Sequence, residues 1–459
     1  MSSHTENDII TKVTDKTYSI IDRENKIMSY TTRVPYYPLI VERAKGAKVV
    51  DIEGNEFIDF LSSAAVINVG HNHPKVVKAV NDQVNKFIHY TPAYMYHKPH
   101  IELAEKLAEI TPGNFEKRVA YGLSGSSSVD GAIKAARCFT KRKKIISFLR
   151  SYHGTTFGAL SVSGYGTEMR RGMEPMVPEV EFIPYPDCYR CLNNKKRTDC
   201  NLACLKYFEN MLETVVPPEE VAAIIFEPMQ GDAGIIVPPQ EYYDKLIGIC
   251  KRYGILVIAD EVQTGFGRTG KMFACEHFGI EPDIIVMGKA IASGMPLSAI
   301  VARKEIFESW GAPVHFFNTA GNAVSCSASI ATIDVINDEK LLDNANTQGD
   351  YIISRFRALM EKYNCIGDVR GTGMFIGVDI VKDRNTKERD VNKTAKICWR
   401  CWEKGLILAF FSGSVLRVEP PLCLSREEAE KAMDIIEKAI AEVEEGLVPD
   451  EVLEQIKGW

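Results

Sequence analysis

Between about residues 70 and 320, short apolar segments alternate with longer segments of helical periodicity. Six apolar segments are bounded by glycine, proline or polar residues: RVAYGL (118–123), KIISFL (144–149), EVEFIPY (179–185), AAIIFEP (222–228), GILVIAD (254–260) and DIIVMG (283–288). Continuous apolar strands are typical of a sheet that helices cover on both faces. The alternation therefore predicts an α/β fold around a mostly parallel sheet.

The pattern differs on either side of this region. Residues 48–60, KVVDIEGNEFIDF, alternate between apolar and polar and predict a hairpin with Glu53-Gly54-Asn55 at its turn. After residue 330, long amphipathic helices and the strand-like segments GTGMFIGVDI, LILAF and SVLRVEP are typical of a smaller α+β domain. We expect a large domain of residues 66–325 and a small domain of residues 326–459, to which residues 1–65 contribute.

Two reactive side chains stand at the ends of predicted strands. Asp260 ends GILVIAD, and Lys289 follows DIIVMG directly. Ligands of an open α/β sheet bind beyond the carboxyl ends of its strands. A carboxylate there can keep a cofactor's ring nitrogen protonated, and a desolvated lysine has the lowered pKa that Schiff-base chemistry needs. The alternative for Lys289 is a surface lysine whose ammonium reaches solvent.

Three further strand ends carry small, aromatic or acidic residues. RVAYGL runs into Ser124-Gly125-Ser126-Ser127-Ser128 and then a helix, where free N–H groups can bind a phosphate or where a serine simply caps the helix. KIISFL is followed by Ser151-Tyr152-His153-Gly154, which can present an aromatic face. AAIIFEP leads to Glu227 and Asp232, two carboxylates at the same edge.

The blocks ILVIADEVQTGFGRTG (255–270) and PDIIVMGKAIASGMPLSAI (282–300) resemble the class III (ω) aminotransferase family of fold-type I enzymes that use pyridoxal 5′-phosphate (PLP). The resemblance covers roughly residues 30–445. It implies the fold-type I architecture, with a seven-stranded, mostly parallel sheet in the large domain. It also implies a homodimer, or a dimer of dimers, with active sites at the subunit interface.

The resemblance assigns a role to residues around the cofactor ring. Lys289 would hold PLP as a Schiff base, and Asp260 would pair with the pyridine nitrogen, which makes the ring an electron sink. Gln263 would lie near the ring's phenolic oxygen, and Tyr152 would stack on the ring.

The phosphate site is implied in the same way. Gly125 and Ser126 would bind the phosphate, and Glu227 belongs to the same cofactor-binding edge. In the family, a threonine of the partner subunit usually completes this site. By spacing Asn318 occupies its place and Thr319 is the neighbouring residue, so either is a candidate.

Within the family, the chain is most similar to the amino-acid racemase branch, which includes isoleucine 2-epimerase, aminocaprolactam racemase and broad-specificity racemases. The strings INVGH, HYTPAY, PYPDCYR, QGD, ASGMPLSA and the terminal Gly458-Trp459 carry this likeness. Family aminotransferases that act on two different substrates have an arginine where this chain has Thr155 and a glutamate where it has Asp232. Arg417 matches the family arginine that clamps an α-carboxylate, which favours a free amino acid over a lactam.

These features predict a racemase or 2-epimerase of free α-amino acids, with an apolar side chain or broad specificity. Lys289 would remove the Cα proton, and Asp232, through Tyr152 or a water, would return one on the opposite face. The alternatives are an aminotransferase that passes the amino group to a 2-oxo acid, and a protein of this fold kept for binding or regulation. Asp232 could instead only cap backbone N–H groups of its loop.

Composition limits the partners. A net charge of −6 gives no basic surface for nucleic acid or an anionic membrane. No apolar run approaches the ~20 residues that span a bilayer, and the first ten residues, MSSHTENDII, are too polar for a signal peptide. We therefore expect a cytoplasmic enzyme whose partner is a small amino acid.

Four of the twelve cysteines stand close together in PDCYRCLNNKKRTDCNLAC. Cys188, Cys191, Cys200 and Cys204 have the spacing C-x₂-C, eight residues, C-x₃-C, which is a candidate for a tetrahedral metal site. The PLP chemistry needs no metal, and a loop of free thiols or a disulfide are the alternatives.

Overall fold

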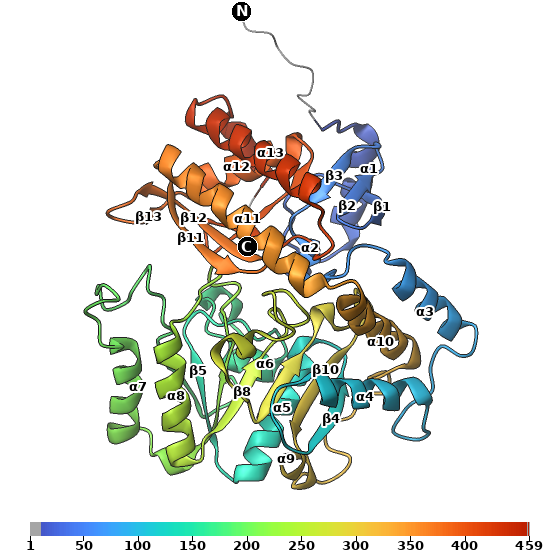
Figure 1. The fold of residues 1–459 in the computed structure, drawn as a ribbon, viewed down its shortest axis with the longest axis vertical. Coiled ribbons are helices and arrows are strands. Elements are labelled where there is room, and N and C mark those ends of the chain that lie inside the picture. The colour runs from blue at the N-terminus through green and yellow to red at the C-terminus, as the bar shows by residue number, and fades with distance from the viewer. Residues whose placement is uncertain (1–10, 457, 459) are drawn as a thin grey trace, which may run out of the picture.

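The computed structural model describes residues 11–456 and Gly458. Trp459, part of the terminal string quoted above, and the first ten residues lie outside the described residues. The chain forms a large lower layer around one sheet and a smaller upper layer built from both ends of the chain (Figure 1).

The large sheet has seven strands and is mostly parallel, so the predicted fold class is confirmed. Its order is β4 (Lys117–Gly122), β10 (Ser298–Arg303), β9 (Ile284–Met287), β8 (Leu256–Asp260), β7 (Val221–Phe226), β5 (Lys144–Phe148) and β6 (Val180–Ile183). Only β10 runs antiparallel to its neighbours β4 and β9. The central strands β7, β8 and β9 are buried along their whole length, which matches their continuous apolar sequence.

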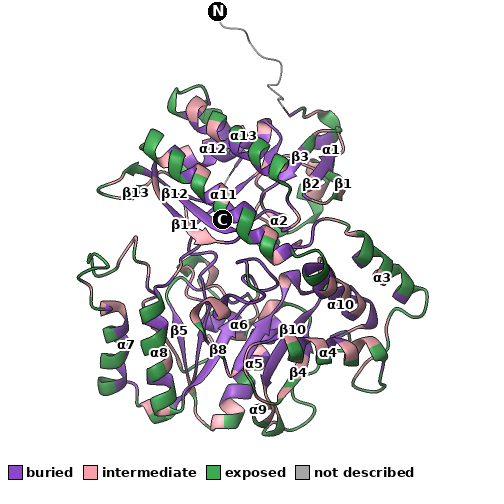
Figure 2. Cartoon of the chain, viewed as in Figure 1, coloured by how far each residue is buried: buried purple, intermediate pink, exposed green. Residues whose placement is uncertain are grey.

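Helices cover this sheet, and their ends follow from local sequence. They are α4 (Lys98–Ile110), α5 (Gly125–Thr140), α6 (Phe157–Val162), α7 (Ala203–Thr214), α8 (Gln240–Tyr253) and α9 (Lys304–Glu308). Helix α3 (Pro74–Val84) instead packs against α10 (Ala323–Asp338). In α8, Glu241 lies in the first turn and Lys251 and Arg252 in the last, which complements the helix dipole. The helix stops at Gly254, whose φ of +61° suits a left-handed cap. The outward faces of α7 and α8 are exposed and the strands behind them are buried (Figure 2).

The upper layer holds two smaller sheets. One has the order β11 (Ile366–Thr372), β12 (Phe375–Asp383), β16 (Val415–Val418) and β15 (Ala409–Phe411), with β13 (Glu388–Arg389) paired to β12. The other has the order β1 (Val41–Lys45), β2 (Lys48–Asp51), β3 (Glu56–Asp59) and β14 (Leu406–Ile407). The antiparallel pair β2–β3 confirms the predicted hairpin.

Strand β14 runs parallel to β3, which joins the N-terminal segment to the C-terminal part of the chain. The associated helices are α1 (Asp15–Ile27), α2 (Ser62–Ala65), α10 (Ala323–Asp338), α11 (Leu341–Lys362), α12 (Val391–Glu403) and α13 (Arg426–Glu444). Short 3₁₀ helices lie at Tyr30–Thr32, Thr167–Met169, Pro218–Glu220, Ala274–Phe278, Lys289–Ala292 and Asp450–Glu454. The boundaries at residues 65 and 325 remain predictions.

None of the helices in residues 11–456 combines the length and the apolar sequence that a membrane crossing requires.

Candidate active site

The carboxyl ends of β7, β8 and β9 meet the N-terminus of α5 around a cavity of about 200 Å³. Seven residues singled out from the sequence line it together: Gly125, Ser126, Tyr152, Glu227, Asp260, Gln263 and Lys289. The structure thus brings these residues together, as the order of strand ends predicts. Their individual roles remain predictions.

Asp260 is held at the base of this cavity by two contacts. Its Oδ2 lies 2.6 Å from Nδ1 of His153, and its Oδ1 accepts a hydrogen bond from the backbone N–H of Val262 at 3.1 Å. The His153 ring is fully buried, and its Nε2 has no hydrogen-bond partner among the described residues. His153 lies within the string already noted for Tyr152, but nothing in its spacing linked it to Asp260. The pair fixes a buried carboxylate where a cationic ring nitrogen could bind.

Lys289 begins a 3₁₀ helix directly after β9, and its backbone is in the left-handed region with φ of +46°. A non-glycine residue in this region is strained, and such strain gathers at functional sites. Burial lowers the pKa of Lys289, while the negative charge of Asp232 opposes this shift. A lowered pKa increases the fraction of neutral amine, which is the form that acts as nucleophile and base.

The first turn of α5 forms one wall. Ser124 caps the helix, and its hydroxyl accepts a hydrogen bond from the N–H of Ser127 at 3.4 Å. The first N–H groups of a helix have no acceptor within it and favour an anion. A Cβ atom on Gly125 would lie 2.8 Å from Cγ1 of Val262, so a larger residue would fill the space beside these N–H groups.

Glu227 connects two loops of the site. Its Oε1 accepts from the N–H of Tyr152 at 3.0 Å and its Oε2 from the N–H of Gly231 at 2.9 Å. Burial raises the pKa of Glu227 to about 7. The same carboxyl group therefore positions the predicted stacking ring and the segment that leads to Asp232.

Arg417 and Asp232 form a buried ion pair beside this cavity. Arg417 is 2% exposed, and its guanidinium carbon lies 3.2 Å from the centre of the Phe411 ring. Its Nε has no hydrogen-bond partner among the described residues and lies 3.7 Å from Glu419. Asp232, Glu419 and the Phe411 ring thus hold this guanidinium in one orientation, in which it could bind a carboxylate.

Two neighbours of this pair were not anticipated. Glu419 accepts a hydrogen bond from Nε2 of Gln263 at 2.9 Å and so links the Arg417 pair to the cofactor cavity. Burial and the nearby Asp232 raise the pKa of Tyr165 to about 12, and its ring lies edge-on to that of Tyr152, 6.3 Å between centres. Tyr165 stands in a loop without regular periodicity, so the sequence offered no signal for it.

Asn318 and Thr319 do not line the cavity and are both exposed. The backbone carbonyl of Asn318 accepts a hydrogen bond from Nε2 of His89 at 2.8 Å, on a part of the surface rich in aromatic residues. Their contact with a phosphate of another subunit stays a prediction.

The four clustered cysteines line a separate small cavity of about 30 Å³ and are free thiols. In residues 11–456, however, no three His, Cys, Asp or Glu side chains are arranged to hold a metal ion. The candidate metal site at Cys188, Cys191, Cys200 and Cys204 is therefore not supported.

The residues of the main cavity fit PLP in chemistry. A helix N-terminus with glycine at its first position suits the phosphate, and the fixed carboxylate of Asp260 suits the ring nitrogen. The partly desolvated amine of Lys289 suits the aldehyde, and Tyr152 supplies an aromatic face.

Comparison with known proteins identifies the family that the sequence motifs resemble. Residues 29–440 match the model of the family described as aminotransferase class-III. The chain is 48% identical to the leucine/methionine racemase of Thermococcus litoralis, over 96% of this chain and 99% of that protein. It is 45% identical to the isoleucine 2-epimerase of Lentilactobacillus buchneri, over 95% and 97%. The PLP-bound structure of an amine transaminase from an uncultivated Pseudomonas species superposes with a TM-score of 0.83 at 29% identity, over 88% of this chain and 95% of that one.

Proposed function

Because this chain belongs to the class III aminotransferase family of PLP-dependent enzymes, we propose that it is a racemase or 2-epimerase of free α-amino acids. The relatives named above as a racemase and a 2-epimerase are similar to this chain over nearly its whole length. The observation that carries the proposal is the buried pair of Arg417 and Asp232 beside Lys289. This arrangement supports carboxylate binding by Arg417 and proton transfer by Lys289 and Asp232 around one reaction centre.

PLP, when bound, withdraws electrons from Cα and so makes its proton acidic. In our proposal Arg417 binds the α-carboxylate of the substrate and fixes the direction of the Cα–H bond. Lys289 takes the proton on one face. Asp232 takes up a proton from water once the substrate has displaced it from Arg417, and delivers that proton to the other face, directly or through Tyr152.

The substrate carboxylate and Asp232 compete for the same guanidinium in this scheme. Asp232 neutralises Arg417 while the carboxylate position is empty, which stabilises a cation that is almost fully buried. Arrival of the substrate lets Arg417 exchange partners and frees Asp232 for proton transfer. Phe411, packed on Arg417, favours an apolar substrate side chain or broad specificity.

An aminotransferase is the second candidate, and the same ion pair favours it. Family aminotransferases use a glutamate at this position to neutralise the arginine, and Asp232 makes that contact here. The two reactions differ in their need for an acceptor. We expect PLP-loaded enzyme to convert an L-amino acid into its D or 2-epimeric form without any 2-oxo acid, as measured by chiral chromatography. Conversion that occurs only with a 2-oxo acid, and that yields a new amino acid, would establish the aminotransferase instead.

We further propose a homodimer in which Asn318 and Thr319 complete the phosphate site of the partner subunit. Large apolar side chains are exposed around these residues, namely Ile88, Tyr90, Tyr94, Met95, Tyr96 and Phe316. Such a contiguous apolar surface is typical of an interface.

We also propose that the enzyme works in the cytoplasm. Its twelve cysteines are all unpaired, which suits a reducing compartment. Recovery of the enzyme in a membrane-free cytoplasmic fraction would support this location, and recovery outside the cell would oppose it.

A further inference from the structure

A second cavity, of about 540 Å³, lies between the insertion that follows β6 and the turn that joins β12 to β13. It shares no lining residue with the cofactor cavity. Five basic side chains line it: Arg190, Lys195, Lys196, Arg197 and Lys387. No carboxylate is among the residues that line it, although the chain as a whole is acidic. The cavity is therefore a local concentration of positive charge.

Most of this charge is not neutralised inside the protein. Arg197 pairs with Glu241 at 3.2 Å across an exposed surface, where screening makes the contact weak. Within the described part of the chain, Lys195, Lys196 and Lys387 have no carboxylate oxygen within 4.0 Å. The exposed ammonium groups of Lys195 and Lys196 thus remain available to a ligand, and Lys387 adds a positive charge that no carboxylate neutralises.

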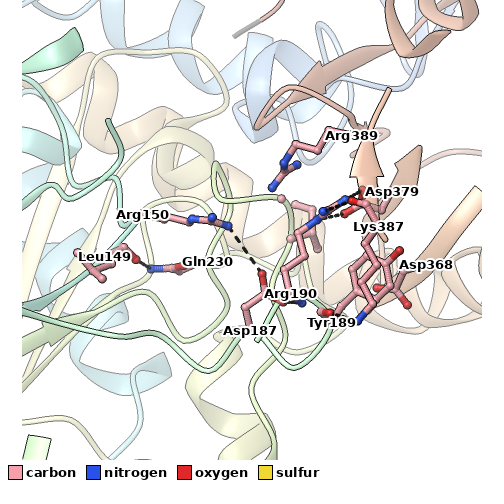
Figure 3. A network of polar contacts seen from close by, with 12 residues as sticks. Leu149, Arg150, Asp187, Tyr189, Arg190, Gln230, Asp368, Asp379, Lys387 and Arg389 are labelled. Carbon is pink, nitrogen blue, oxygen red and sulfur yellow. Dashed lines mark hydrogen bonds and ion pairs between the residues drawn. The ribbon is translucent and has the colours of Figure 1, made fainter. Parts of the chain in front are cut away.

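The walls of the cavity are held together by a polar network between the two layers of the fold (Figure 3). Arg190 pairs with the buried Asp379 at 2.6 Å and also donates to the backbone carbonyl of Lys387. Nζ of Lys387 donates to the backbone carbonyl of Tyr189 at 2.5 Å. The insertion and the β12–β13 turn are therefore fixed against each other, so that the basic groups converge.

The network itself has more cations than anions. Asp379 is shared between Arg190 and Arg370, and Arg370, 3.3 Å from Asp379, also pairs with Asp368 at 2.7 Å. Figure 3 shows Arg389 directed toward the same region, and its guanidinium forms no ion pair within 4.0 Å among the described residues. Burial and the neighbouring arginines lower the pKa of Arg389 to about 10, which agrees with a positive potential.

We propose that this basic cavity binds a small polyanion that carries two or more phosphate groups. Its volume lies in the range of small-molecule sites and exceeds what one phosphate requires. Its polar and basic lining suits charged oxygens, which lysine and arginine bind through charge-assisted hydrogen bonds. The ligand bridges the insertion and the β12–β13 turn, and so stabilises the contact between the large and small layers.

Calorimetric titration of PLP-loaded enzyme with inorganic tripolyphosphate, at constant ionic strength, tests this proposal. PLP fills the phosphate site at α5, so the probe cannot bind there. We expect saturable binding with one site per subunit and a higher melting temperature. The variant Lys195→Glu/Lys196→Glu, altered only at exposed positions, should bind at least about tenfold more weakly because attraction becomes repulsion.

A matched control makes the same change of charge at two lysines outside the cavity. Lys431→Glu/Lys438→Glu alters two exposed lysines of α13 and should bind tripolyphosphate as the unmodified enzyme does. Absence of saturable binding, unchanged affinity in the Lys195/Lys196 variant, or equal loss in the control would each overturn the proposal. Amino-acid conversion by all three proteins is measured in parallel. A loss of conversion would bear on the proposed function of the cofactor site, whereas a loss of tripolyphosphate binding bears on this cavity.

Discussion

Among single residues, Arg417, which we propose binds the substrate carboxylate, is the most informative. Arg417 is buried between Asp232, Glu419 and the Phe411 ring, so its removal leaves two carboxylates without their cation. We expect Arg417→Ala to cost about 2–5 kcal/mol of transition-state stabilisation, the range for truncating one partner of a buried charge pair. The ratio kcat/KM for free amino acids measures this cost.

Arg417→Lys is the matched control, because it keeps the charge but loses bidentate binding. It should retain more activity than the alanine variant. If Arg417→Ala leaves kcat/KM for free amino acids intact, Arg417 does not bind the substrate carboxylate.

Glu227 gives a prediction about pH. The pKa of its carboxyl rises from an ordinary 4.5 to about 7 in the folded protein because of burial. Below about pH 4.5 the carboxyl is protonated in both the folded and the unfolded protein, so it does not lower the free energy of unfolding. As the pH rises toward 7, only the unfolded state ionises, and the free energy of unfolding falls by up to about 3 kcal/mol.

Urea denaturation of PLP-free enzyme between pH 5 and 8 measures this effect. Glu227→Gln cannot ionise, so its stability relative to the unmodified enzyme should improve through this interval. A constant difference between the two proteins across the interval would show that Glu227 keeps its ordinary pKa.

Among the elements, we expect the start of α5 to determine how tightly PLP binds. Gly125→Ala places a methyl group 2.8 Å from Val262, beside the first N–H groups of the helix. We expect the dissociation constant of PLP to rise by at least about tenfold, since either the helix start or the phosphate must shift. Gly248→Ala, in α8 with open space around its Cβ, is the control and should bind PLP normally. Equal affinity in both variants would contradict this role of α5.

The elements also show what sequence could predict. Strands β7, β8 and β9 are continuously apolar and are followed by polar or small residues. This sequence pattern was enough to predict both the sheet and the positions of Asp260 and Lys289 at its edge. Strand β10 was not among the six segments predicted, because SAIVAR follows the small-residue run after Lys289 without a clear boundary. The contacts of His153 and Tyr165 depend on how distant loops meet, which no local pattern contains. The cysteine spacing indicated a metal site, but the fold does not place three of the thiols as ligands in the described residues.

At the scale of the whole molecule, the exposed aromatic surface around residue 90 predicts the assembly. Tyr90→Asp/Phe316→Asp places charge in the middle of the proposed interface, where both side chains are largely exposed in the single chain. We expect this variant to become monomeric in light scattering and to bind PLP more weakly, because Asn318 and Thr319 no longer reach a partner. Val215→Asp, an exposed apolar position beyond α7, should remain a dimer. A double variant that stays dimeric would contradict this choice of interface.

In the proposed reaction a proton leaves one face of Cα and another is added on the opposite face. Proton NMR of an L-amino acid in D₂O, with PLP-loaded enzyme and no 2-oxo acid, tests this directly. We expect loss of the Cα proton signal together with deuterium in both the L and the D or 2-epimeric product. We also expect Asp232→Asn to slow formation of the inverted product more than exchange in the L form. Exchange confined to the L enantiomer, or no exchange until a 2-oxo acid is added, would contradict the proposed reaction.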